Sequence, residues 1–468
     1  MKFRLRATCA ALALAATSVG AADAQNPDAF VLPPGMFRLS VEGTHASYES
    51  VFDASGTSVP LATGLAGELT PGRFAALRPL ATQLTDFFAA TNGNAVDPGG
   101  ISLGTLDAQA AATWTQGVAR LAVGLFPRFE IGASLPLIRS DRTIQRLGLA
   151  GGTVGVNPSP TANAAILARI GWGPLGASGL LPTAESPAGI ELQSRVTALA
   201  GEPLSLPADT ADAEVLQSLL AEAYGLPPLT SRVDPYRIGD VEVYGRLLLL
   251  SSFGRAPFPS DSAPAGLRVS LTGGARLPTG TEPDSLPLLA PPPDTRLSSY
   301  FGGVAADLFL GPRLWLSGAA RINRNLGSDV TRRLAPADSP LSVTDPPQVV
   351  TLRRGGSLEI AVAPRFRLAE SIWLAAEYSG VMVGDTEYSL AGSGDGAAVL
   401  SLAGGGLHRA GVGIRYSSLA AYWAGRASLP ADIALTYLRT ISGPEGAPAG
   451  GAVTVTASLL PQLWSRRR

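Results

Sequence analysis

The sequence predicts an all-β fold, namely a transmembrane antiparallel β-barrel of about twelve strands with long extracellular loops that carry short helices. Three observations lead to this prediction. Segments along the chain alternate polar and apolar residues with a period of two, which is typical of strands between two environments. The N-terminus has the pattern of an export signal. The connections between these segments are alternately short and long, as in bacterial outer-membrane barrels.

The N-terminal segment has the parts of a secretory signal peptide. A positive region, Lys2 to Arg6, precedes an apolar run that ends at about Ala22. Ala22-Asp23-Ala24 fits a cleavage site after that run. We therefore expect a signal peptide over residues 1–24 and the outer-membrane barrel over residues 25–468.

The composition of the 468 residues excludes several classes of protein. Charged residues make up 16% and hydrophobic residues 46%, whereas a soluble domain is about 25% charged and a disordered chain is poor in apolar residues. Two His and the single Cys9 leave no metal site, disulfide framework or implied cofactor. The net charge of −1 offers no basic surface for nucleic acid. No apolar run after the signal reaches the 18 residues of a membrane-spanning helix.

Twelve segments show the alternation. In the clearest, Ser357 to Leu368, polar Glu359 and Arg365 share one face while Ile360 and Phe366 share the other. The predicted strands are 37–48, 107–126, 129–146, 238–249, 268–278, 297–310, 313–325, 357–368, 371–385, 407–416, 427–442 and 452–460. Bacterial single-chain barrels have an even number of strands, which places both termini in the periplasm.

The connections alternate in length. Short periplasmic turns are expected at 127–128, 311–313 and 369–370, with longer ones at 254–266 and 417–426. Long extracellular loops are expected at 53–106, 147–235, 281–296, 326–356 and 386–406. The aromatic residues near the predicted turns fit an interfacial girdle: Phe126, Phe129, Trp315, Phe366, Trp373, Tyr416, Tyr422, Trp423 and Trp464.

Two of the loops are inserts long enough for helices, about 53–106 and 147–235. In the second, apolar residues share one face of Asp209–Tyr224, with Asp209 or Thr210 as a cap. In the first, helix-like spacing runs from Thr70 to Phe88, where Pro79 would kink the helix or divide it. Such inserts could fold over or into the pore, or only decorate the surface.

No motif gives firm evidence of catalysis. His45-Ala46-Ser47 has the spacing of the His and Ser of outer-membrane phospholipases, but no Asn follows within forty residues and alternation turns His45 toward lipid. Gly392-Ser393-Gly394-Asp395-Gly396 lacks the carboxylates of a calcium site and fits a flexible loop. We therefore predict that the protein is not an enzyme.

The expected interior of the barrel is charged. Alternation points charged side chains of both signs away from lipid. An Arg on the lipid face near the bilayer midplane would destabilise the barrel by about 2–4 kcal/mol. These candidate lumen-lining residues are Glu130, Asp240, Glu242, Arg246, Arg268, Arg276, Asp307, Arg321, Glu359, Arg365, Arg367, Glu377 and Asp432. Similar numbers of both signs predict either a weakly selective passage or a lumen braced by ion pairs.

Two neighbouring predicted strands carry short motifs. Ile238-Gly239-Asp240-Val241-Glu242-Val243 and Arg246-Leu247-Leu248 precede a strand that ends in Gly274-Ala275-Arg276-Leu277-Pro278-Thr279-Gly280. This hairpin resembles outer-membrane transport barrels similar to the long-chain fatty-acid channel and to the barrel encoded with phenol meta-cleavage pathways. The resemblance is best over about 120–325. It implies a channel for small hydrophobic or aromatic compounds.

The chain also departs from that family. Fatty-acid channels have fourteen strands and an N-terminal hatch that plugs the lumen, whereas about eleven mature residues precede the first strand here, near Met36. We take these as too few for a hatch, so any plug would come from the 53–106 or 147–235 insert. At the C-terminus, Ser465 and three Arg follow Trp464, where barrel-assembly signals usually end in an aromatic residue.

We therefore predict a channel or transporter of the bacterial outer membrane for passive uptake or efflux of small hydrophobic molecules, with the long loops as gate or capture site. Its partners would be the lipid bilayer, a small-molecule substrate and, during biogenesis, the barrel-assembly machinery. The alternative is a closed structural or adhesin-like surface barrel that works through its loops. A third reading is a membrane-embedded lipid enzyme. The channel and the closed surface barrel differ in whether the inward charges close the lumen.

Overall fold

The computed structural model describes residues 28–63, 66–74, 77–91, 97, 100–172, 179–208, 232–233, 235–252, 265–281, 296–332, 348–390 and 398–462. Four predicted features lie outside these residues: the signal peptide, the helix over 209–224, the glycine-rich segment 392–396 and Trp464. None of the helices within the described ranges has the length and apolar character needed to cross a membrane.

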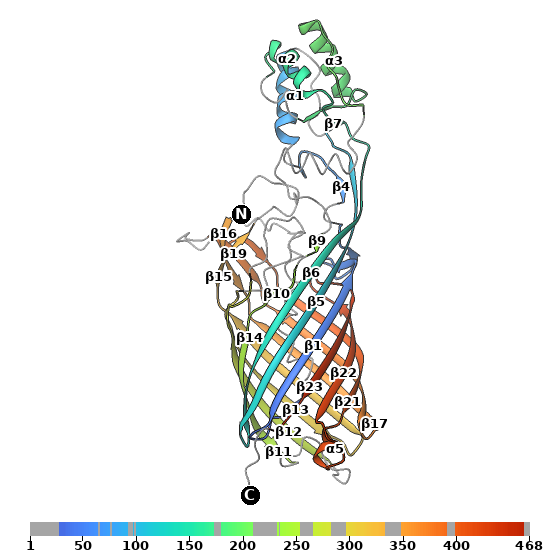
Figure 1. The fold of residues 1–468 in the computed structure, drawn as a ribbon. Coiled ribbons are helices and arrows are strands. Elements are labelled where there is room, and N and C mark those ends of the chain that lie inside the picture. Colours follow the sequence, from blue (N-terminus) through green and yellow to red (C-terminus); the bar gives the residue numbers. More distant parts are fainter. Residues whose placement is uncertain are drawn as a thin grey trace.

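Twelve antiparallel strands close into one barrel (Figure 1). Each coincides with a predicted segment to within four residues at either end, so the predicted fold class is confirmed. The barrel strands are β1 (Phe37–Tyr48), β5 (Thr105–Phe126), β6 (Phe129–Ala150), β11 (Glu242–Ser251), β12 (Gly266–Arg276), β13 (Ser299–Phe309), β14 (Leu314–Asn325), β17 (Ser357–Ala369), β18 (Ile372–Val383), β21 (Gly405–Ser417), β22 (Ala431–Ser442) and β23 (Gly451–Leu459).

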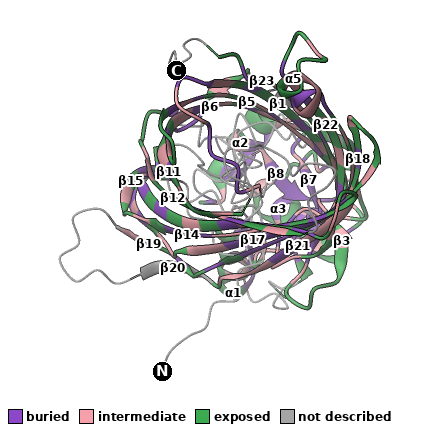
Figure 2. Ribbon diagram, turned by 90° about the horizontal axis from the view of Figure 1, so that it is seen from below, coloured by how far each residue is buried: buried purple, intermediate pink, exposed green. Residues whose placement is uncertain are grey.

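The first and last strands close the barrel. β1 pairs with β23 from Leu39↔Leu459 to Ser47↔Gly451, and its other edge pairs with β5. Every other barrel strand pairs with its neighbours in chain order, so the strands form a ring around the interior (Figure 2). Closure leaves no unpaired backbone edge, which is what a lipid environment requires of a sheet.

The wall is apolar outside and polar inside. In β1, Leu39 and Val41 face outward and are half exposed, whereas Ser40, Glu42 and Thr44 at the alternate positions are buried inside. The same alternation continues around the ring, where β22 exposes Ile433, Leu435 and Tyr437. A period-two pattern places apolar side chains against lipid on one side of a sheet and polar side chains against one another on the other side.

The short turns gather at one end, here called the turn end, and the long loops at the other, called the loop end (Figure 1). The turn end is periplasmic by the rule for bacterial barrels. Its longest described connection, between β21 and β22, contains helix α5 (Leu419–Trp423). Strand β1 begins and β23 ends there, beside a bridge between Met36 and Gln462.

The predicted aromatic girdle is only partly correct. Phe126, Phe366 and Tyr416 are exposed on the outer surface near the turns, as expected. Trp315 and Trp373 instead point inward, where they pack edge to face with ring centroids 5.5 Å apart. The Trp315 indole N–H donates to Asp307 inside the barrel, a partner that lipid could not supply.

Strands β5 and β6 extend beyond the loop end and carry a small domain, here called the head (Figure 1). The head consists of α1 (Arg78–Ala90), α2 (Pro160–Arg169), α3 (Pro187–Ala200), β4 (Gly67–Glu68), β7 (Val154–Val156) and β8 (Leu180–Pro182). Leu84 and Phe88 of α1, Leu167 of α2 and Leu192 of α3 belong to one buried apolar cluster. Both long inserts therefore contribute to a domain outside the membrane.

Pro79 begins a helix here and does not kink one. It lies in the first turn of α1, where a proline lacks only an N–H that would have no partner within the helix. Helices α2 and α3 were not predicted. Each begins with a Ser-Pro pair, Ser159-Pro160 and Ser186-Pro187, and Gly201 ends α3 in the left-handed conformation.

The remaining short strands belong to the loops. β15 (Ser328–Arg332), β16 (Gln348–Arg354), β19 (Thr386–Leu390) and β20 (Ala398–Leu402) form a four-stranded sheet from two neighbouring loops. β2 (Ser50–Phe52) pairs with β3 (Ser58–Pro60), and β9 (Arg232–Val233) and β10 (Arg237–Ile238) pair with β6.

Candidate functional site: the barrel interior

The structure places all the predicted lumen charges on the inner side of the barrel. Ten are buried, and Arg276, Arg367 and Glu377 are partly buried. The ten are Glu130, Asp240, Glu242, Arg246, Arg268, Asp307, Arg321, Glu359, Arg365 and Asp432. They form two clusters, one near each end of the barrel.

The cluster near the turn end surrounds residues 28–36, here called the N-terminal segment. Inside the barrel, the backbone N–H of Ala29 donates to Asp307 at 2.9 Å, and that of Leu32 donates to Glu130 at 2.7 Å. The Phe30 ring lies 5.6 Å from the Arg38 guanidinium and 5.4 Å from that of Arg268. Two predicted lumen carboxylates therefore hold a backbone inside the barrel.

We expected too few residues before β1 for a hatch, yet residues 28–36 enter the barrel. The N-terminal segment needs few residues because it is held through its own backbone N–H groups. Phe30, Leu32 and Met36 also share an apolar cluster with Ala122 and Leu460 of the wall. The 53–106 and 147–235 inserts, from which we expected any plug, supply the three helices of the head.

Arg415 links this segment to the wall. Its guanidinium pairs with Asp432 through Nη2 at 2.6 Å and Nε at 2.8 Å, and Nη2 lies 3.8 Å from Asp28 of the N-terminal segment. Bidentate pairing fixes an arginine in a way that a single contact does not. Asp432 therefore positions the Arg415 guanidinium, which also attracts the Asp28 carboxylate.

A second cluster lies nearer the loop end. Glu242 of β11 pairs with Arg276 of β12 at 2.7 Å and with Arg321 of β14 at 3.0 Å. Arg321 also lies over the Phe301 ring and donates to Asn323, which in turn donates to Glu359 of β17. This chain joins four strands across the lumen face, and it braces the wall.

Asp240 has a structural role. Its carboxylate accepts from the backbone N–H groups of Gly280, Arg296 and Leu297 at 2.8–3.0 Å. These groups flank the connection between β12 and β13. Asp240 therefore fixes both ends of a loop, and the G-D motif of the predicted hairpin contributes to loop geometry.

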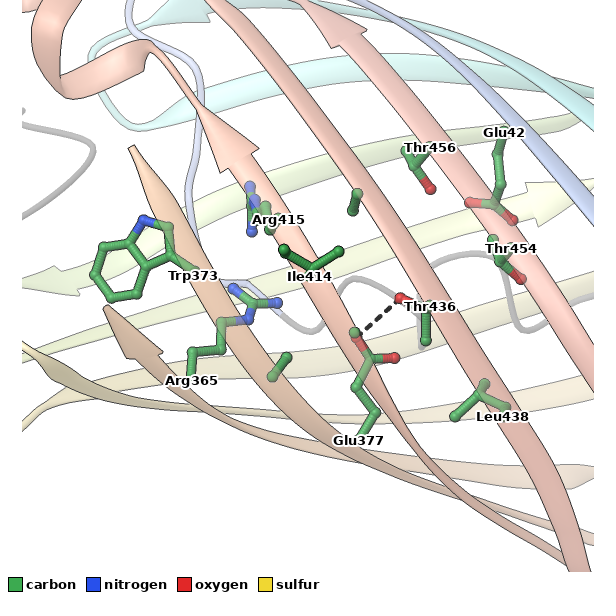
Figure 3. Close-up of a pocket in the computed structure, with 13 residues that line it drawn as sticks. Glu42, Arg365, Trp373, Glu377, Ile414, Arg415, Thr436, Leu438, Thr454 and Thr456 are labelled. Carbon is green, nitrogen blue, oxygen red and sulfur yellow. Dashed lines mark hydrogen bonds between the residues drawn. The ribbon is translucent and has the colours of Figure 1, made fainter. Parts of the chain in front are cut away.

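Beside the N-terminal segment, the wall contains a recess (Figure 3). The space in and in front of it, open solvent included, amounts to about 540 Å³. Arg365, Arg415, Glu377 and Trp373 border it, and Figure 3 shows the Arg365 guanidinium lying between Arg415 and Glu377. Glu377 accepts from the Thr436 hydroxyl at 3.3 Å.

Sequence reasoning missed several residues of this interior. Arg415 could have been found, because outward Val412, Ile414 and Tyr416 turn it inward. Glu42 follows in the same way from Leu39 and Val41, and it pairs with Arg120 at 3.0 Å. Asp28 had no such signal, since it precedes the first strand and belongs to no alternating pattern.

The histidines lie outside the lumen. His45 faces outward as expected, and its Nδ1 atom is 3.0 Å from Thr115 Oγ1. His408 also faces outward, with Nδ1 2.7 Å from the Tyr378 hydroxyl oxygen. In the described part of the chain no group of three or more His, Cys, Asp or Glu side chains could hold a metal ion.

A closed twelve-stranded barrel with an apolar outer face and a polar interior defines an outer-membrane β-barrel protein. No family model and no curated protein matches the sequence. Among solved structures, the COG4313 outer membrane channel from Pseudomonas putida F1 aligns with a TM-score of 0.46 and 10% identity over 93% of this chain and 98% of that one.

Two further structures illustrate the range of similar barrels. The P. putida toluene transporter TodX aligns with a TM-score of 0.26 and 10% identity, over 94% of this chain and 92% of its own. The transport unit of the autotransporter AIDA-I from Escherichia coli has a TM-score of 0.34 and 7% identity, over 95% and 96%. These similarities concern the barrel fold alone.

Proposed function

We propose that this barrel is a passive channel for uptake or efflux of small hydrophobic molecules. The proposal rests on the observation that the lumen holds residues 28–36 and, beside them, a recess in the wall. Eight strands enclose an interior that side chains alone can fill, and twelve enclose a wider one. Here the extra width holds a separate chain segment and an unfilled recess, and the charged side chains line the wall around them.

The contacts of the N-terminal segment suit a movable obstruction. Residues 28–34 are held by two backbone hydrogen bonds to wall carboxylates, one ionic contact at 3.8 Å, the contacts of the Phe30 ring with Arg38 and Arg268, and a small apolar cluster. The end of the segment is bonded to the wall, since the Gly35 N–H donates to Gly124 O of β5 and Met36 bridges to Gln462. Displacing residues 28–34 would leave the ladder of the wall intact.

The test is uptake of a hydrophobic probe across the outer membrane. Cells that make the full chain should take up the fluorescent probe 1-N-phenylnaphthylamine faster than cells that make an equally abundant closed eight-stranded barrel. A variant lacking the head, with β5 and β6 joined by a short turn, should keep this rate because the lumen is unchanged. Equal uptake by the full chain and the closed barrel would refute the proposal.

The head supports a second candidate function, a surface scaffold or adhesin. Its three helices have their own apolar core and are held beyond the barrel on the β5–β6 ribbon. A transport barrel does not need such a domain for passage through its lumen. Loss of surface attachment on removal of the head, together with absence of probe uptake by the full chain, would favour this function.

A further inference from the structure

The recess is formed by small residues at adjacent inward positions of three strands. Ala375 of β18 pairs directly with Gly413 of β21, and Gly413 pairs with Thr436 of β22, two residues from Ala434. A Cβ atom at Gly413 would lie 2.9 Å from Thr436 Oγ1 and 3.3 Å from Glu377 Oε1, so these two side chains already cover Gly413. The hollow therefore lies beside the small side chains of Ala375 and Ala434, where larger ones would fill it.

Two guanidinium groups border the hollow with unused donors. Arg365 is 4% exposed, yet its Nη1 atom has no hydrogen-bond partner among the described residues. Nη1 of Arg415 is also buried without such a partner, although Asp432 holds the rest of that group. A buried donor without a partner costs free energy, so an acceptor that enters the recess is favoured.

The carboxylates around Arg365 are Asp28, Asp307 and Glu377, and among the described residues none of them forms an ion pair with it within 4 Å. Asp28 lies 3.8 Å from Arg415, Glu377 accepts from Thr436, and Asp307 accepts from Ala29, Trp315 and Ser317. Arg365 instead lies over the Trp315 ring at 4.7 Å, which fixes its plane. A planar fork held in this way suits a planar, two-oxygen acceptor.

We propose that the recess is a binding subsite for small organic monocarboxylates that have an apolar body. The carboxylate accepts from Arg365 Nη1 and Arg415 Nη1, and the apolar body lies over Ala375 and Ala434 beside Trp373. This inference deepens the proposed channel function by naming amphipathic acids among its substrates. Two carboxylates also line the recess, Glu377 and Glu42, of which Glu42 is paired with Arg120. They would oppose the ligand's charge and limit its affinity, which suits release from a transport site.

The test is calorimetric titration of the refolded full chain with sodium benzoate, with benzyl alcohol as a neutral ligand of similar size. Saturable benzoate binding is expected, with weaker binding of benzyl alcohol. Arg365→Gln should weaken benzoate binding tenfold to a hundredfold, roughly the range for loss of a charge-assisted hydrogen bond. Glu377→Gln should strengthen it about threefold, because a like charge is removed.

Arg409→Gln is the matched control. Arg409 lies on the inner face of β21 like Arg415, and its Nε and Nη2 atoms also lack hydrogen-bond partners, but it does not border the recess. Its substitution should leave benzoate affinity unchanged, whereas Ala375→Leu should abolish binding by filling the hollow. Retained heat-modifiable migration on a gel shows that each variant is folded.

Absence of saturable benzoate binding by the wild-type chain would overturn the inference, as would equal affinities of the wild type and Arg365→Gln. Weaker binding by Glu377→Gln would also contradict it, because the ligand group beside Glu377 would then not be an anion. The titration needs no transport. Specific binding without probe uptake would therefore refute the channel and leave the subsite standing.

Discussion

The barrel and the head bury their residues in opposite ways. In the barrel, apolar side chains such as Leu271 face outward and charged ones such as Asp307 are buried. In the head, Leu84 and Phe88 are fully buried and charged pairs such as Arg169–Glu202 are exposed. Each region keeps its apolar side chains away from water. The head buries them in its own core, whereas the barrel exposes them to the surrounding lipid.

The two regions therefore depend on different interactions. The head depends on apolar packing in water, where a cavity is costly. The barrel depends on a closed backbone ladder and on polar pairing inside, where an unpaired charge is costly. The same kind of substitution should consequently have different effects in the two regions, and each of the following changes tests this.

The largest effect is expected in the head. Phe88→Ala removes a fully buried ring from the apolar cluster and should destabilise the head by about 4 kcal/mol. Limited proteolysis should then cut the head readily, while the barrel keeps its heat-modifiable migration. Loss of the barrel in this variant would contradict the separation of the two regions.

The next effect is expected in the barrel interior. Asp432→Ala leaves Arg415 without its bidentate partner and should cost about 3 kcal/mol, since Asp28 compensates only in part. Unfolding in urea with lipid vesicles measures this cost. The control is Glu370→Ala, which breaks the exposed pair with Arg426 and should cost less than about 1 kcal/mol.

A smaller effect is expected on the lipid face. Leu271→Arg puts a charge near the middle of β12 and should cost about 2 kcal/mol. Ile322→Arg, nearer the loop end of β14, should cost less than about 1 kcal/mol because the cost falls toward the interface. Equal costs in vesicle unfolding would argue against the assigned membrane position.

The smallest effect concerns pH at the loop end. Burial, and secondly the Asp53 carboxylate, raise the pKa of Glu445 above its ordinary value. A raised carboxyl pKa means that the native turn is most stable below the ordinary pKa and loses stability as the pH rises through the native one. Hydrogen exchange of the Gly446 N–H, which donates to Phe52 O, should show this loss. Glu445→Gln should remove it, and an unchanged pH dependence would contradict the assignment.

The barrel could be predicted from the sequence, and the head largely could not. Alternation is a property of each strand alone. The inward direction of Glu359 and the outward direction of Ile360 can therefore be predicted without knowing which strands pair with theirs. The buried faces of α2 and α3 include the polar Asn163 and the glycine Gly189, so the apolar periodicity of these helices is weak. Their Ser-Pro starts were the available signal.

The same reasoning explains which parts of the site were missed. Inward direction followed from period two, but pairing did not, because Glu242, Arg276 and Arg321 come from three separate strands. The entry of the N-terminal segment depends on carboxylates that meet its backbone N–H groups, and no side-chain pattern in residues 28–36 encodes this contact.

Single-channel conductance in a planar bilayer tests the central claim most directly, which is that the N-terminal segment obstructs the lumen and the head does not. Replacing residues 28–34 with Gly and Ser should raise the conductance well above that of the full chain. Shortening the 147–235 insert should leave it unchanged. A rise only after shortening that insert would show that the head is the plug, and silence of both variants would contradict a passage through this lumen.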